Sequence, residues 1–282
     1  MHIRADLHVH TRASDGDLDP EQVVSQARYS GIDAVAVTDH DTVAGTQEAL
    51  ASAQKHGIEV IAGVEISAIF EPGTLHILGY FPSYPHGFEQ ALKPLQEARK
   101  LRFPRMIEKL NRLGIGVSLE DVLKIAGTAQ IGRPHIAKAL IGKGFVRDFE
   151  EAFSRYLAKG RPAYVEKEKM TPGEAIRTIL AYKGIPVLAH PFTLELEKSE
   201  LRRFIRELAG LELMGIEICY PEHTRSQKRL FTQIAQEHGL LVTGGTDFHG
   251  PGPSGLTIGA CGLDAEGLRV FRERLYQRPS SG

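Results

Sequence analysis

The sequence is poor in cysteine and contains no long apolar run. Its 282 residues include two cysteines, Cys219 and Cys261, which have no CxxC spacing and stand beside apolar residues. This pattern is typical of buried free thiols in a reducing, cytoplasmic setting. No run of about 18 apolar residues occurs, as a membrane-spanning helix would need. The chain does not begin with a basic segment followed by an apolar one, so we expect neither a signal peptide nor a membrane span.

The sequence also lacks an excess of either charge, with 34 Lys and Arg against 35 Asp and Glu, but the two signs are unevenly distributed. Residues 93–169 hold 17 Lys and Arg against 9 Asp and Glu, an excess of eight positive charges. The rest of the chain holds 17 against 26, an excess of nine negative charges. Helical patterns follow one another in the basic stretch. We therefore expect residues 93–165 to form an inserted helical cap whose positive surface attracts phosphates.

Outside this insertion, short apolar runs alternate with amphipathic helical patterns. We expect strands at residues 3–8, 33–38, 59–67, 75–80, 186–189, 215–219 and 240–243. Alternating strands and helices form right-handed βα units around a parallel sheet. Their number favours a closed, TIM-like barrel with its site at the C-terminal ends of the strands. The sequence thus predicts an α/β barrel formed by residues 1–92 and 166–282.

Histidine is abundant, with 12 residues, and its placement is the most informative feature of the sequence. Six histidines fall at the predicted C-terminal ends of strands or in the turn directly after, and three carboxylates occupy equivalent places. Such positions meet at one mouth of a barrel. We therefore predict nine converging metal ligands: His8, His10, Asp15, His40, Glu65, His76, His190, Asp247 and His249.

Some of these positions are informative on their own. His8 and His10 are two residues apart, so in a strand both side chains project from one face. Glu65 stands in an apolar strand, where a bare buried carboxylate would be destabilising by several kcal/mol, so it must be paired or bound to a cation. Asp6 shares the face of His8, and it either orients a ligand imidazole or ends the strand without a role.

The ligand types restrict the chemistry. Imidazole and carboxylate without thiolate suit Mn, Fe or Zn, and Mg less well because of the many nitrogens. Nine ligands are too many for one ion with an open position, so we expect two or three divalent ions. Clustered cations generate hydroxide at neutral pH and bind both the attacking and the leaving oxygen of a displacement at phosphorus. This predicts phosphoester hydrolysis by a metal-bridging hydroxide, and neither a GxSxG nor a P-loop motif indicates another mechanism.

Six motifs in chain order make the sequence resemble the PHP (polymerase and histidinol phosphatase) superfamily. They are DLHVHTRASDG at 6–16, TDHD at 38–41, GVEIS at 63–67, HILGY at 76–80, AHP at 189–191 and TDFH at 246–249. The resemblance implies a distorted (β/α)7 barrel with a trinuclear centre, for which manganese is the ion we expect. It also implies three ligand sets: His8, His10, Glu65 and Asp247; Glu65, His76 and His190; and Asp15, His40 and His249.

The inserted segment is similar to that of a stand-alone PHP group that includes nucleoside 3',5'-bisphosphate phosphatases and 5'-to-3' exoribonucleases acting on short RNA. The similar motifs are GRPHI at 132–136 and GRPAYV at 160–165. In that group the insertion caps the barrel mouth, which implies substrate contacts from Ser14, Arg133, His135, Arg161 and His223, with His223 also a candidate acid. Arg133 and His135 equally suit an exposed helix start, and helix N-termini themselves bind anions.

The resemblance thus implies an enzyme that removes the 3'-phosphate from nucleoside 3',5'-bisphosphates and also trims short oligoribonucleotides. Long duplex DNA fits poorly, because the acidic barrel would repel an extended polyanion. Three alternatives stay open: a histidinol phosphate phosphatase, a C–N hydrolase of the amidohydrolase type, and a PHP module that only binds a partner. No lysine stands at a predicted strand end of the mouth, which disfavours the second, and the full ligand set disfavours the third. Oligomeric state and base preference stay open.

Overall fold

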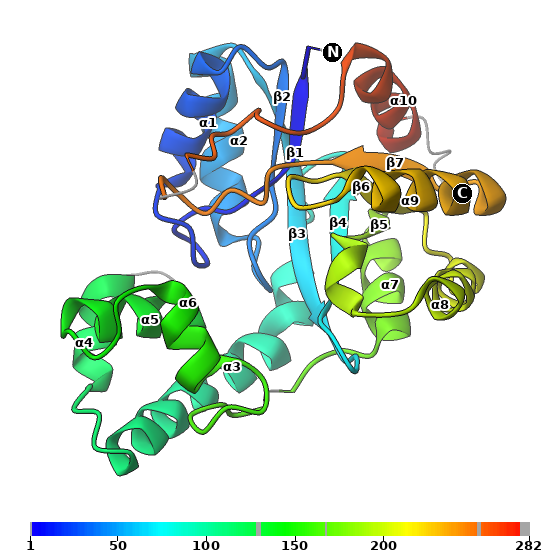
Figure 1. Cartoon of the computed structure of the whole chain (residues 1–282). Helices are drawn as coiled ribbons and strands as arrows, with labels where there is room; N and C mark the ends of the chain where they lie inside the picture. Colours follow the sequence, from blue (N-terminus) through cyan, green and yellow to red (C-terminus); the bar gives the residue numbers. More distant parts are fainter. Residues whose placement is uncertain (1, 128–130, 167, 253–254, 277–282) are drawn as a thin grey trace.

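A computed structural model describes residues 2–127, 131–166, 168–252 and 255–276. Within them, seven strands form one sheet whose spatial order follows the chain: β1 (Ala5–Val9), β2 (Ala34–Val37), β3 (Glu59–Ala68), β4 (Leu75–Phe81), β5 (Ile185–Leu188), β6 (Gly215–Cys219) and β7 (Leu241–Gly244). The sheet curls into a nearly closed barrel (Figure 1). The segment after β7 completes the wall beside β1, where Asp247 N donates a hydrogen bond to His8 O (2.8 Å). The predicted α/β barrel is confirmed.

The sheet is mixed, which corrects the expectation of a parallel sheet. β1, β2 and β3 run parallel, as do β5, β6 and β7, but β4 runs antiparallel to both of its neighbours, β3 and β5. The reason is the short connection of residues 69–74 between β3 and β4. A parallel return needs a crossover of about a dozen residues or more, whereas a short loop forms a hairpin.

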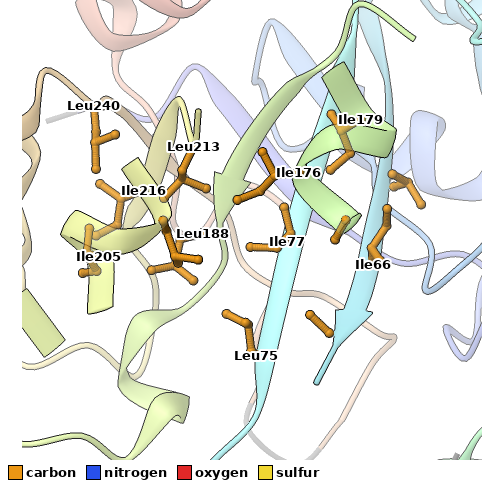
Figure 2. Packing of buried hydrophobic residues seen from close by; sticks show 14 of the residues in the cluster. Ile66, Leu75, Ile77, Ile176, Ile179, Leu188, Ile205, Leu213, Ile216 and Leu240 are labelled. Carbon is orange, nitrogen blue, oxygen red and sulfur yellow. The ribbon is translucent and has the colours of Figure 1, made fainter. Parts of the chain in front are cut away.

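Helices cover the outside of the barrel: α1 (Pro20–Tyr29), α2 (Ala44–His56), α7 (Pro172–Ala181), the short η2 (Pro191–Leu194), α8 (Lys198–Gly210), α9 (Arg225–His238) and α10 (Ala265–Tyr276). Capping residues determine where several of these helices begin. Asp19 precedes Pro20 at the start of α1, and the Thr171 hydroxyl accepts a hydrogen bond from Glu174 N at the start of α7. Figure 2 shows how side chains such as Ile176 of α7 pack against Ile77 of β4 in the layer between helices and strands.

The cap is built on α3 (Phe88–Arg112), a helix that belongs to two hydrophobic cores. Phe88 and Leu92 pack among the buried residues of the barrel, whereas Phe103, Met106 and Leu110 pack within the cap. The expected boundary at residue 93 therefore falls inside one continuous helix. The cap also contains α4 (Leu119–Ala126), α5 (Arg133–Gly142), α6 (Phe149–Ala152) and the π-helical turn η1 (Phe153–Leu157), and in Figure 1 it lies below the barrel. Across the described residues, every helix is too short or too polar to span a bilayer.

Ion pairs join the cap to loops of the barrel. Lys138 of α5 pairs with Asp17 in the loop after β1, and Lys159 pairs with Glu71 in the loop between β3 and β4 (Nζ to Oε1, 2.7 Å). These loops belong to the edge of the barrel at which the parallel strands end. The basic segment therefore lies against the same edge as the predicted ligands.

Candidate metal centre

Glu65 is fully buried in β3 and lies among five of the predicted imidazole ligands. One carboxylate oxygen, Oε1, lies 2.7 Å from Nδ1 of His76 and 3.0 Å from Nε2 of His190. The other oxygen, Oε2, lies 2.9 Å from Nδ1 of His40, 3.3 Å from Nε2 of His10 and 3.5 Å from Nε2 of His8. The two oxygens of one carboxylate thus face different imidazoles, so each oxygen would serve as a ligand atom in a different part of the cluster.

Asp247 and Asp15 lie close to the remaining imidazoles. Oδ1 of Asp247 lies 3.0 Å from Nε2 of His10 and 3.2 Å from Nε2 of His8, and Oδ1 of Asp15 lies 3.3 Å from Nε2 of His249. All nine predicted side chains therefore converge. Within the described residues, ligand atoms of eight of them form three groups in which all atoms lie within 4.8 Å of one another: His10, Asp15, His40 and His249; His8, His10, Glu65 and Asp247; and His40, Glu65 and His76. The ninth, His190, lies outside these groups but contacts Glu65.

His76 reaches the mouth by a different route from the one expected. The sequence pattern placed it at the C-terminal end of a strand, but it is the second residue of β4, which corrects that placement. Because β4 is antiparallel, its start lies at the edge of the sheet where the parallel strands end. Nδ1 of His76 lies 3.3 Å from Nε2 of His190, so these two imidazoles and Glu65 bring three ligand atoms together.

Many polar atoms of this cluster are buried without a hydrogen-bond partner. Within the described residues, such atoms include His8 Nε2, both ring nitrogens of His10, Asp15 Oδ1, His40 Nδ1, Glu65 Oε2 and Asp247 Oδ1. Buried polar groups in proteins are nearly always hydrogen-bonded or bound to an ion. Imidazole nitrogens and carboxylate oxygens that converge without protein partners fit divalent cations. The cluster therefore suggests a centre for divalent metal ions.

The ionisation of the cluster is set by opposite charges in close contact. Burial opposes ionisation of Glu65, but the surrounding imidazoles, His76 foremost, hold the pKa of its carboxyl well below the usual range. Burial likewise acts to lower the pKa of His10, yet the adjacent carboxylates of Asp247 and Glu65 raise it to about 10. At neutral pH the metal-free protein therefore holds an ionised Glu65 and a protonated His10.

Cation binding at this cluster is expected to release protons. With a pKa of about 10, His10 is protonated at neutral pH in the metal-free protein, and a protonated imidazole does not bind a cation. The affinity for Mn²⁺ should therefore rise as the pH is raised from about 7 to about 9, with protons released to the buffer. Calorimetric titration in two buffers of different ionisation enthalpy measures both effects. A pH-independent affinity without proton release would contradict this expectation.

Glu217 is a buried residue of β6 that the sequence analysis missed. Its Oε1 lies 3.1 Å from Nδ1 of His8, and its Oε2 accepts a hydrogen bond from His190 N at 2.8 Å. It thereby holds His8 with Nε2 toward the cluster, as carboxylates orient metal-binding imidazoles in other proteins. The signal that identified Glu65, a carboxylate within an apolar strand, applies equally to Glu217 and would have found it.

Glu217→Gln is expected to weaken Mn²⁺ binding about 10- to 100-fold, the usual effect of losing a group that orients a ligand imidazole. Glutamine keeps the volume of the side chain but not its charge. The matched control is Glu222→Gln, which alters an exposed glutamate in the loop after β6. Titration of both variants with Mn²⁺ measures the difference, and equal affinities would rule out the orienting role of Glu217.

Asp6 and Tyr220 hold the segment that carries Asp247. The Asp6 carboxylate accepts hydrogen bonds from Thr246 N (2.9 Å), from the Thr246 hydroxyl (2.7 Å) and from Gly259 N (2.9 Å). Asp6 thus binds backbone and hydroxyl groups rather than an imidazole. Tyr220 Oη donates to Oδ2 of Asp247 at 3.0 Å, which leaves Oδ1 of that carboxylate facing His8 and His10.

A pocket of about 230 Å³ lies between the cluster and the cap. Part of its lining consists of predicted ligands: Asp15, His40, His76 and His249. Another part consists of cationic side chains: Arg99, Arg102, Arg133, Lys159 and Lys169. Burial, together with the charge of Arg133, lowers the pKa of Arg102 to about 10. Like charges are therefore crowded in this part of the pocket, and a bound anion would reduce their repulsion.

The cap residues expected to contact substrate lie in different surroundings. Arg133 lines the pocket, with its guanidinium carbon 5.4 Å from the ring centre of Phe153. His135 is buried, and its Nδ1 accepts a hydrogen bond from Gly132 N (2.8 Å), so it caps its own helix. Arg161 is exposed to solvent and lies outside the lining of this pocket.

The barrel residues expected to contact substrate make hydrogen bonds within the protein. Ser14 Oγ donates to Oδ1 of Asp39 (2.6 Å), which fixes the loop that carries Asp15. His223 is buried and donates from Nδ1 to Ile218 O (2.9 Å). Its Nε2 has no partner among the described residues, and burial lowers the pKa of the ring. At neutral pH His223 is therefore a neutral imidazole with one free acceptor.

Arg99 and Arg102 are pocket residues that the sequence analysis did not single out. Their spacing of three residues on α3 places both on one face of the helix. That spacing was available in the sequence. The direction in which this face of the helix points depends on how α3 packs, which the sequence does not show. In the structure both side chains are buried.

A nearly closed barrel whose mouth gathers imidazoles and carboxylates is the architecture of metal-dependent barrel hydrolases. The PHP domain model matches residues 6–158. The chain is 33% identical over 257 residues to a 3',5'-nucleoside bisphosphate phosphatase of Chromobacterium violaceum, covering 90% of each protein. It is 36% identical over 254 residues to a 5'-3' exoribonuclease of Haemophilus influenzae, covering 89% of this chain and 92% of that protein. The chain belongs to the PHP family.

Comparison of solved structures agrees with this assignment. An amidohydrolase from Chromobacterium violaceum, solved with bound sulfate and no metal, superposes with a TM-score of 0.87. The two chains are 30% identical, and the superposition covers 96% of each. The similarity therefore includes both the barrel and the cap.

Proposed function

We propose that this PHP protein is a phosphoesterase that hydrolyses the 3'-phosphate of nucleoside 3',5'-bisphosphates, such as adenosine 3',5'-bisphosphate. Water adds to phosphorus, and the products are the nucleoside 5'-monophosphate and inorganic phosphate. The observation that carries the proposal is the pocket, which joins the ligand cluster to five cationic side chains. A small molecule with two phosphates matches both parts. The substrates named for two relatives, a nucleoside bisphosphate and RNA, belong to the same chemical class.

The three groups of ligand atoms would hold two or three divalent ions, for which we propose manganese. Fe and Zn suit the same nitrogen and oxygen donors, and Mg suits them less well. Divalent cations supply Lewis-acid chemistry at such a site, since they acidify water and offset negative charge on phosphoryl oxygens. Glu65 would help to hold more than one of these ions, because its two oxygens face different imidazoles.

The protein's own cationic side chains would bind and orient the second phosphate. Arg102 donates from Nε to Val165 O (2.6 Å), and its guanidinium carbon lies 5.0 Å from the ring centre of Tyr164. Guanidinium groups held in this way bind phosphate oxygens with little further loss of side-chain freedom. With the 5'-phosphate bound there and at Arg133, the 3'-phosphate would be oriented toward the ligand cluster.

The other expected substrate residues take supporting roles in this proposal. Ser14 holds the Asp15 loop, and His135 holds the start of α5, on which Arg133 lies. His223 would protonate a leaving oxygen only after taking up a proton at Nε2, because its Nδ1 proton is donated to Ile218 O. The exposed Arg161 would act through its charge rather than by direct contact.

Short RNA is the second substrate class that we propose, on the basis of the similarity to an exoribonuclease. The pocket lies under the cap, so it would receive the end of a single strand rather than a continuous duplex. Long duplex DNA is therefore not proposed as a substrate. We also propose a cytoplasmic location, which the two free cysteines, Cys219 and Cys261, favour.

The alternatives differ in what they require of the pocket. A histidinol phosphate phosphatase would need to recognise a cationic leaving group, which five cationic side chains oppose. C–N hydrolysis of the amidohydrolase type usually uses a carboxylated lysine as the bridge, and here Glu65 stands among the imidazoles instead. A module that only binds a partner would have no need for the complete set of converging ligand atoms.

A substrate panel with metal-loaded protein tests the proposal. Adenosine 3',5'-bisphosphate should release phosphate with a higher kcat/KM than histidinol phosphate, and simple amides should not be hydrolysed. A higher kcat/KM for histidinol phosphate would overturn the nucleotide assignment. Release of no phosphate from any nucleotide would favour the binding module.

A further inference from the structure

Asp41 directly follows His40 and is fully buried, with its backbone in the left-handed region (φ 53°). Its carboxylate accepts hydrogen bonds from Ser67 N (2.9 Å) and from Nη2 of Arg99 (2.6 Å), and its own N–H donates to Glu65 O (3.0 Å). Asp41 therefore joins three parts of the molecule: strand β3, the loop that carries His40, and the helix α3 on which the cap is built.

Arg99 contacts Asp41 and also lines the pocket. Its side chain is 8% exposed and its Nη2 donates to Asp41. Its Nε is buried without a partner in the part of the chain that the structure describes, and the side chain lines the pocket between cluster and cap. Gln96, one turn earlier on α3, donates from Nε2 to Asp41 O (3.1 Å). Two side chains of the cap helix thus hold the residue next to a predicted metal ligand.

We propose that Arg99 is a positioning residue for the metal centre. By holding Asp41, it keeps Nδ1 of His40 at 2.9 Å from Glu65 and so couples the cap helix to cation binding at His40. This inference rests on the proposed function in one respect, the presence of divalent cations at the cluster. Without the rigid guanidinium that donates to it, Asp41 would be a buried carboxylate in a strained backbone conformation without its fixed partner, and such a group moves or draws in water. His40, as the adjacent residue, would move with it.

Arg102 provides the matched comparison. It lies three residues further along α3, lines the same pocket and carries the same charge, but it donates to Val165 O in the cap rather than to the loop that carries His40. If Arg99 only bound a substrate phosphate, the two arginines would behave alike. Both would affect KM, and neither would affect metal binding in the absence of substrate.

The test compares Arg99→Lys with Arg102→Lys in the full chain, each titrated with Mn²⁺ alone by calorimetry. Lysine keeps the positive charge but loses the fixed fork of donors. Arg99→Lys is expected to weaken the binding of one equivalent of Mn²⁺ by about 10-fold or more, as loss of a partner that orients a ligand does. Arg102→Lys should leave the affinity for every equivalent of Mn²⁺ unchanged. Gln96→Ala, which removes the neutral contact to Asp41, should weaken the same equivalent by a smaller factor.

Unchanged Mn²⁺ affinity in Arg99→Lys would overturn the inference, and so would equal losses in the two lysine variants. If Arg99→Lys fails to fold, Gln96→Ala decides the matter, because unchanged affinity there also overturns the coupling. The proposed phosphoesterase function can fail independently of this inference. Wild-type protein that binds Mn²⁺, shows the Arg99 effect and yet hydrolyses no phosphoester would leave the coupling standing and remove the enzymatic assignment.

Discussion

Asp247→Ala is expected to lower kcat/KM for adenosine 3',5'-bisphosphate by at least about 10³-fold, the upper range for loss of one group that stabilises charge in a transition state. Oδ1 of this carboxylate faces His8 and His10, and Oδ2 accepts a hydrogen bond from Tyr220. The substitution therefore removes a ligand atom from the middle of the cluster. Because the side chain is 19% exposed and belongs to no hydrophobic core, the fold should be retained. Steady-state kinetics and circular dichroism measure the two effects.

His10→Ala should behave in the same way, because both ring nitrogens of His10 belong to the cluster. The control is His56→Ala. His56 ends α2 and lies 3.4 Å from Glu21 of α1, so its removal should leave kinetics unchanged. Near-normal turnover in a well-folded Asp247→Ala protein would show that the reaction takes place elsewhere.

Arg133→Ala is expected to raise KM for a nucleoside 3',5'-bisphosphate about 10- to 100-fold, since a hydrogen bond to a charged group contributes roughly 1.5–3 kcal/mol. Arg133 lines the pocket beside Arg102 and Lys169, where the proposal places the 5'-phosphate. Hydrolysis of a nucleoside 3'-monophosphate, which lacks that group, should change little. The measured quantity is the ratio of kcat/KM for the bisphosphate to that for the monophosphate.

Lys124→Ala is the control for the overall charge of the cap. Lys124 lies on α4, is exposed and pairs with Glu120 (2.8 Å), so its removal subtracts the same charge without touching the pocket. If Arg133 contacts the 5'-phosphate directly, the ratio of kcat/KM for the bisphosphate to that for the monophosphate should fall in Arg133→Ala and stay constant in Lys124→Ala. Equal changes in both variants would mean that the cap attracts substrate through its general field and makes no defined phosphate contact.

The ligand residues could be predicted from the sequence because two simple rules act on them. Residues that follow parallel strands meet at one edge of a barrel, which brings together His40, His190 and Asp247. A carboxylate inside an apolar strand needs a partner, which identifies Glu65. His76 satisfies neither rule in the expected way, since it begins an antiparallel strand, and the direction of β4 is set by a short loop rather than by the residue itself.

The substrate contacts could not be predicted to the same degree, because they depend on how the cap helices turn. Arg99, Arg133 and Arg161 are equally basic in the sequence, yet the first two line the pocket and the third is exposed. The packing of α3 in two cores decides this for Arg99. Glu217 is a different case: it is buried in an apolar strand like Glu65, and consistent use of the same rule would have included it.

Elemental analysis of the purified protein, coupled to phosphate release from adenosine 3',5'-bisphosphate before and after treatment with a chelator, tests the central claim most directly. The three ligand groups predict two or three equivalents of divalent metal per chain in active protein. They also predict loss of phosphate release when the metal is removed and recovery when Mn²⁺ is returned. Protein that carries no metal and releases phosphate at an undiminished rate in chelator would contradict the account.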